Sequence, residues 1–189
     1  MILAVDPGPV LSGFMLRDGW KILAQGKATA KEIEEIGMRF EPLPDGVLLI
    51  EQVRNYGNGN NTLLRTAEVG ARMAGKLAWM GWTPAYVPRA DVLRLLDVLH
   101  LKGNRDKLVR NVLIDMNGGS RQLAFGTKDN PGPLYGVKAD AMQAMGLAVA
   151  YERAPEEARQ GWKDLASDQW SPNLDEKTEK KRYIRGGGR

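Results

Sequence analysis

Two short, fully apolar runs, 2–5 and 47–50, stand out along the chain and predict buried β-strands, because Ile, Leu and Val in runs of this length are typical of strands covered on both faces. The first run ends at Asp6, where a Pro/Gly cluster predicts a tight turn, and the second ends at Glu51. Asp6 alone fits a turn residue that hydrogen-bonds its own backbone equally well. Two strands that each end on a carboxylate are harder to explain by structure alone.

The rest of the pattern alternates between strand and helix periodicity, which predicts an α/β fold with a mixed central sheet flanked by helices. We expect 12–16 and 21–24 to form an antiparallel meander with the first strand, and 84–88 to form a further short strand. The expected helices are 30–36, 63–80, 89–99, 107–116 and 139–152. A domain over 1–153 is predicted, followed by a charged extension, 154–189, that we expect to be partly disordered.

The amino-acid composition limits the residue types that could carry catalysis or bind a metal. The 189 residues suit one domain, and no apolar stretch approaches the ~18 residues of a membrane span, so we expect a cytoplasmic protein with no membrane partner. The absence of cysteine excludes disulfides, zinc–cysteine sites and thiol catalysis. His100 is the single histidine, which excludes a two-histidine mechanism. Acid–base or metal chemistry must therefore come from carboxylates.

Positive charge is concentrated in one part of the chain. The formal net charge is +4, but residues 53–110 carry ten Lys/Arg residues against four acids. Such a surplus suggests a polyanionic partner such as nucleic acid, although a solvated basic face is the alternative explanation.

A third carboxylate, Asp140, falls in the first turn of the helix expected at 139–152. A favourable interaction with the helix dipole would explain Asp140 by itself. Together with the acids at the ends of the two apolar strands, however, it completes a set of oxygen donors of the kind that Mg²⁺ prefers. Two such ions about 4 Å apart can clamp a phosphodiester, with Asp6 bridging both.

At this point the sequence resembles the RuvC-like Holliday junction resolvases, a branch of the RNase H-like nuclease superfamily, over roughly residues 1–151. The resemblance rests on the segments 2–8 with 12–14, 47–53, 103–107 and 139–150. The loop 117–136 is similar to that of phage-encoded members.

The resemblance implies an RNase H-like fold and a Mg²⁺-dependent endonuclease that resolves four-way DNA junctions by paired symmetric cuts, as in DNA recombination and repair. It implies a homodimer with two-fold symmetry, to whose interface helix 63–80 contributes, and two Mg²⁺ ions per site, for which Mn²⁺ could substitute. Metal ligands and catalytic residues would be Asp6, Glu51 and Asp140, with Lys107 acting near the scissile phosphate. The expected DNA contacts are Arg54, Asn55, Tyr56, Arg105, Lys107 and Arg110.

One position departs from the family, which usually carries two acids three residues apart on the last helix. Here Asp140 is followed by Gln143. Asp140 matches the first acid in the ungapped register and the second acid in an alternative register. The fourth ligand position is then neutral or supplied elsewhere, for instance by Gln143 or by the loop acid Asp129.

Two other functions remain open. A non-catalytic protein that binds branched DNA is favoured if the missing acid prevents metal binding. The segment 5–13 also resembles the first phosphate loop of actin-like and sugar-kinase ATPases, but those proteins need two such domains and usually far more residues.

Overall fold

The computed structural model describes residues 1–40, 46–52 and 61–170. Five strands form one sheet in the order β3-β2-β1-β4-β5. Strand β1 pairs antiparallel with β2, β2 pairs antiparallel with β3, and the β1–β4 and β4–β5 pairs are parallel. The strands are β1 (Ile2–Asp6), β2 (Ser12–Asp18), β3 (Lys21–Ala28), β4 (Val47–Gln52) and β5 (Thr83–Pro88). The predicted meander and mixed sheet are confirmed.

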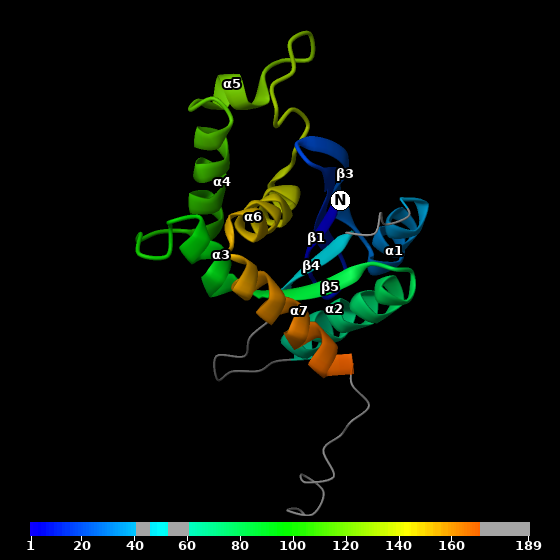
Figure 1. The fold of residues 1–189 in the computed structure, drawn as a ribbon. Coiled ribbons are helices and arrows are strands. Elements are labelled where there is room, and N and C mark those ends of the chain that lie inside the picture. The colour runs from blue at the N-terminus through cyan, green and yellow to red at the C-terminus, as the bar shows by residue number, and fades with distance from the viewer. Residues whose placement is uncertain (41–45, 53–60, 171–189) are drawn as a thin grey trace, which may run out of the picture.

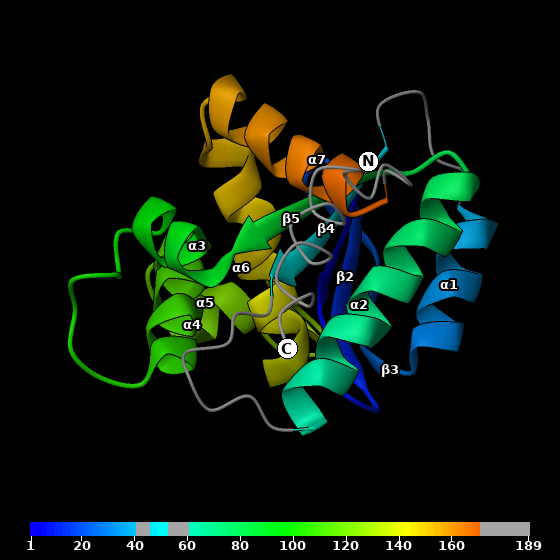
Figure 2. The ribbon, with the colours of Figure 1, turned by 90° about the horizontal axis from the view of Figure 1, so that it is seen from below.

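Helices cover the sheet on both sides (Figures 1 and 2). Helices α1 and α2 pack together on one face, and α6 crosses the other face against β1 and β2, with α3 and α4 behind it. The helices are α1 (Ala30–Arg39), α2 (Asn61–Trp79), α3 (Arg89–Leu95), α4 (Arg105–Met116), α5 (Arg121–Phe125), α6 (Ala139–Arg153) and α7 (Glu156–Trp170). In the described part of the chain, no helix combines the length and the apolar character needed to cross a lipid bilayer.

The alternation of side chains along β1 divides the core into two layers. Leu3 and Val5 pack with α1 and α2, whereas Ala4 packs with α6, and all three side chains are fully buried. This is why the strand is apolar throughout and why α6 is buried along most of its length. Burial on both faces leaves only the ends of the strand accessible, and Asp6 is at such an end.

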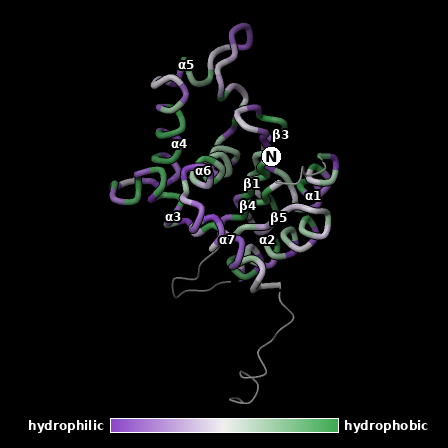
Figure 3. Tube along the Cα trace, viewed as in Figure 1, coloured by the Kyte–Doolittle hydropathy of each residue, from purple (hydrophilic) through white to green (hydrophobic). Residues whose placement is uncertain are grey.

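Two helices differ from the sequence prediction. The loop expected at 117–133 contains the short helix α5, which begins at the side-chain cap of Ser120. The first part of the predicted extension forms α7, which packs against β5 and buries Trp162. Figure 3 shows α7 and the tip of the loop after α5 as largely hydrophilic, which explains why apolar periodicity missed α7. The division of the chain at residue 153 stays a prediction.

Candidate active site

The carboxylates of Asp6 and Glu51 are brought to the same edge of the sheet by the parallel pairing of β1 and β4. Val5 lies beside Ile50 in this register, so the two acids follow side by side at the carboxyl ends of neighbouring strands. This edge is where open α/β sheets place ligands, since the strands end there and the loops diverge. The two acids at the strand ends therefore lie at the same edge of the sheet, and their role as metal ligands stays a prediction.

Asp140 reaches this edge through a close contact between α6 and β2. Gly13 is the register partner of Asp6, and a Cβ atom added at Gly13 would lie 2.4 Å from the backbone oxygen of Asp140. Only glycine allows the first turn of α6 to lie this close to the strand. The side chain of Asp140 is about half exposed and accepts a hydrogen bond of 3.1 Å from Lys27 Nζ on β3.

A fourth acid, Asp106, joins this group from the first turn of α4. The side chain of Asn104 caps this helix by accepting from the Lys107 backbone N–H at 3.0 Å, which fixes where the helix starts. Asp106 is not among the candidate ligands predicted from the sequence. Its position within the segment 103–107, which contributes to the family resemblance, is the signal that could have identified it.

The acids interact strongly with one another. Burial, reinforced by the charges of Glu51, Asp106 and Asp140, raises the pKa of Asp6 to about 7 despite the opposing charge of Arg89. Burial also raises the pKa of Glu51, while its ion pair with Arg89 acts in the opposite direction. Mutual repulsion of this kind is relieved when a cation binds, so this end of the site favours positively charged ligands.

Arg89 is the basic residue that sequence reasoning missed. It begins α3 directly after β5, and its guanidinium donates to Glu51 Oε2 at 2.8 Å, Asp106 Oδ1 at 2.7 Å and Gln143 Oε1 at 3.0 Å. Gln143 in turn donates to the backbone oxygen of Asp106 at 3.3 Å. Arg89 therefore ties together groups from β4, α4 and α6.

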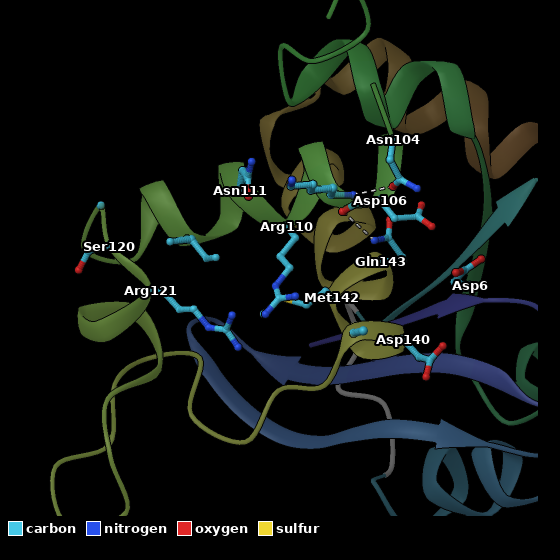
Figure 4. Close-up of a pocket in the computed structure, with 14 residues that line it drawn as sticks. Asp6, Asn104, Asp106, Arg110, Asn111, Ser120, Arg121, Asp140, Met142 and Gln143 are labelled. Atoms are coloured by element: carbon cyan, nitrogen blue, oxygen red, sulfur yellow. Dashed lines mark hydrogen bonds between the residues drawn. The ribbon is translucent and has the colours of Figure 1, made fainter. Parts of the chain in front are cut away.

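A cavity of about 820 Å³ opens beside the acids (Figure 4). Asp6, Asp106 and Asp140 lie at one end of it in Figure 4, whereas Arg110 and Arg121 point into it from the other end. The residues that line it are Asp6, Asn104, Asp106, Lys107, Arg110, Asn111, Ile114, Gly119, Ser120, Arg121, Ala139, Asp140, Met142 and Gln143. The cavity thus has an acidic end, formed by the aspartates, and a basic end, formed by the arginines.

The other predicted site residues have different surroundings. Lys107 and Arg110 line the cavity, and the guanidinium of Arg110 also lies 5.8 Å from the Phe125 ring centroid. Arg105 instead donates to the backbone oxygens of Val98 and Leu101, at 2.9 and 2.6 Å, so it braces the turn before α4.

The remaining predictions concern the fourth ligand position and the DNA contacts expected at 54–56. The exposed Asp129 does not line the cavity, whereas Gln143 does, so of the two suggested fourth positions only Gln143 is close to the other acids. Arg54, Asn55 and Tyr56 lie outside the described residues.

The acids have the chemistry of a site for a divalent cation, but they are not gathered around one point. Within residues 1–40, 46–52 and 61–170, no three acidic or histidine side chains converge closely enough to hold a metal ion as they stand. Asp140 is turned toward Lys27, and Glu51 toward Arg89. Lys27 is exposed and holds Asp140 by one hydrogen bond, whereas Glu51 is paired with the less exposed Arg89.

Comparison with known proteins supports the fold. No protein-family model matches the sequence, and no curated protein matches it either. Two solved structures of Thermus thermophilus RuvC, one of them in complex with a Holliday junction substrate, are similar with a TM-score of 0.51 at 16% sequence identity. The match covers 85% of this chain and 96% and 95% of the RuvC chains. The resemblance seen in the sequence is thus confirmed at the level of architecture, and the chain has the RNase H-like α/β fold of RuvC.

Proposed function

We propose that this protein is a divalent-metal-dependent endonuclease that cleaves branched DNA, with four-way junctions as its main substrate. The observation that carries the proposal is the placement of Asp6, Glu51 and the first turn of α6, with Asp140, at the same edge of a RuvC-like sheet. The RuvC structure with a Holliday junction substrate supports the same class of substrate for this chain.

The donor set supports a hard divalent cation such as Mg²⁺ or Mn²⁺. Asp6, Glu51 and Asp140 are all carboxylates, and the pKa of Asp6 is raised by burial and then by neighbouring negative charge, which a cation would offset. When bound, such an ion supplies Lewis-acid stabilisation of charge on the phosphate and lowers the pKa of water. Two ions per site, as the family resemblance implies, would also require Glu51 to leave its ion pair with Arg89.

The acidic end and the basic wall of the cavity together have the charge distribution expected for binding a nucleic-acid strand. Lys107, Arg110 and Arg121 supply three positive charges along its wall, while the acids occupy the other end. A strand that places one phosphodiester at the acids would place neighbouring phosphates along the basic wall. In this arrangement Lys107 stabilises the charge that develops on the reacting phosphate, and Arg110 and Arg121 hold the strand in register.

Paired cuts across a four-way junction need two active sites related by a two-fold axis, so we propose a homodimer. Helix α2 is the candidate interface, because it exposes the apolar side chains of Leu64 and Trp79, at 64% and 88% of their surface. Gly70 lies on the buried face of α2, where an added Cβ would make only ordinary contacts with Ile50, at 3.4 Å, and with Pro7, at 3.8 Å.

Binding of junctions without cleavage is the second candidate function. In the ungapped register, Gln143 takes the position where the family usually carries a further acid, and Arg89 already pairs with Glu51. A site weakened in this way could still recognise branched DNA through its basic wall.

The test is incubation of the purified protein with a labelled immobile four-way junction and with a linear duplex of the same sequence, in Mg²⁺ and in EDTA. Paired nicks in the junction alone, dependent on Mg²⁺, are the expected result. Tight junction binding with no nick in either Mg²⁺ or Mn²⁺ would mean that the protein recognises junctions but is not a nuclease. Equal cutting of the linear duplex would show that the nuclease is not selective for four-way junctions.

A further inference from the structure

Arg89 lies between three groups of the acidic cluster and is its most firmly held basic residue. Its side chain is 23% exposed and makes three hydrogen bonds, to Glu51, Asp106 and Gln143. An arginine is always charged, and its rigid fork matches two acceptors at once. Glu51 and Asp106 therefore share one positive charge that a side chain of the protein itself supplies.

The second basic partner of the cluster is held much less firmly. Lys27 is 46% exposed and contacts Asp140 through one hydrogen bond of 3.1 Å. A lysine ammonium is a single point charge on a flexible stem, so it can swing into solvent at small cost. The Asp6–Asp140 side of the cluster is therefore open to an incoming ion, whereas the Glu51–Asp106 side is closed.

The balance of charge points the same way. With all four acids ionised, Asp6, Glu51, Asp106 and Asp140 carry four negative charges against the two positive charges of Arg89 and Lys27, so two negative charges remain, which one divalent ion would neutralise. The amide of Gln143, which accepts from Arg89, adds no charge that would require a second ion.

We propose that Arg89 replaces the second metal ion, so that this active site binds a single divalent cation, on the side of Asp6 and Asp140. Arg89 is a positioning residue: it fixes Glu51, Asp106 and Gln143 and supplies a permanent positive charge beside the reacting phosphate. This inference rests on the proposed function, because it assumes that the acids hold a catalytic ion.

The number of Mn²⁺ ions bound per chain tests the inference without any assay of cleavage. The full-length protein is titrated with Mn²⁺, and free Mn²⁺ is followed by electron paramagnetic resonance. The wild type is expected to bind one ion per chain. Arg89→Gln removes the charge, so it is expected to bind two, and Arg89→Lys, which retains the charge, is expected to bind one.

Arg94→Ala is the matched control, because Arg94 lies on the same helix but pairs with Asp91, away from the cavity. It is expected to bind one ion, like the wild type. Two ions on the wild-type chain would overturn the inference, whatever the variants do, and so would a single ion on a folded Arg89→Gln chain. A wild type that binds two ions and cuts junctions refutes only the role of Arg89. A wild type that binds no ion and cuts nothing refutes the proposed nuclease as well.

Discussion

Substitution of Gly13 by alanine tests how the site is assembled, because Gly13 does not itself carry any catalytic group. The added Cβ would lie 2.4 Å from the backbone oxygen of Asp140, whereas ordinary contacts begin near 3.4 Å, so the start of α6 must retreat by about 1 Å. The obstacle is backbone and cannot be relieved by a change of rotamer. Displacement of a catalytic group by this distance can cost on the order of 100-fold in rate. We therefore expect Gly13→Ala to lower single-turnover junction cleavage by roughly that factor.

The assay compares cleavage, junction binding and thermal unfolding of Gly13→Ala with those of Gly161→Ala. A Cβ at Gly161 has no neighbour within 4 Å, so this control alters a glycine in a helix without a clash. Gly13→Ala is expected to keep a cooperative unfolding transition and to bind junctions while cutting them slowly. Wild-type cleavage by Gly13→Ala would refute the idea that this contact sets the position of Asp140.

Three further predictions concern stability, the core and the phosphate. Folding raises the pKa of Asp6 from 3.8 to about 7, so the folded state prefers the protonated acid and the stability of the metal-free protein falls as the pH rises from about 4 to 7. Asp6→Asn should remove this loss and raise the free energy of unfolding at pH 8 by up to roughly 4 kcal/mol, measured by urea titration in EDTA. Trp162→Ala should lower the free energy of unfolding by about 3–5 kcal/mol, because this indole is 5% exposed, contacts the Tyr151 ring and donates a hydrogen bond to Asp91. A loss below about 1 kcal/mol would mean that α7 is not part of the core. Lys107→Ala should slow single-turnover cleavage on the order of 100-fold with little loss of junction affinity, and an unchanged rate would remove Lys107 from the chemistry.

The sheet and its acidic edge could be predicted because their signals are local. The apolar runs that end in Asp6 and Glu51 form strands with buried centres, and their parallel pairing places the two acids at neighbouring strand ends. Asp140 could be assigned from the first turn of its helix, although its approach to the sheet depends on Gly13, which lies far away in the sequence. Strand ends and helix starts are therefore the parts of the site that the sequence predicts best.

The side-chain network around these acids could not be predicted, because its partners are far apart in the chain. Arg89 and Gln143 are separated by 54 positions, and Lys27 and Asp140 by 113. An arginine at the start of a helix opposes the helix dipole and gives no local reason for its presence. Helix α7 was missed for a different reason: its surface is strongly charged, and a few buried side chains such as Trp162 hold it in place.

The central claim is that Asp6 belongs to a catalytic metal centre and is not merely a turn residue. The most direct measurement compares wild type and Asp6→Asn for cleavage and binding of the same labelled four-way junction in Mg²⁺. The account predicts that Asp6→Asn abolishes the paired nicks and binds the junction with unchanged affinity, since asparagine preserves the shape of the side chain and removes its charge. Cleavage at the wild-type rate by Asp6→Asn, or loss of both binding and fold, would contradict it.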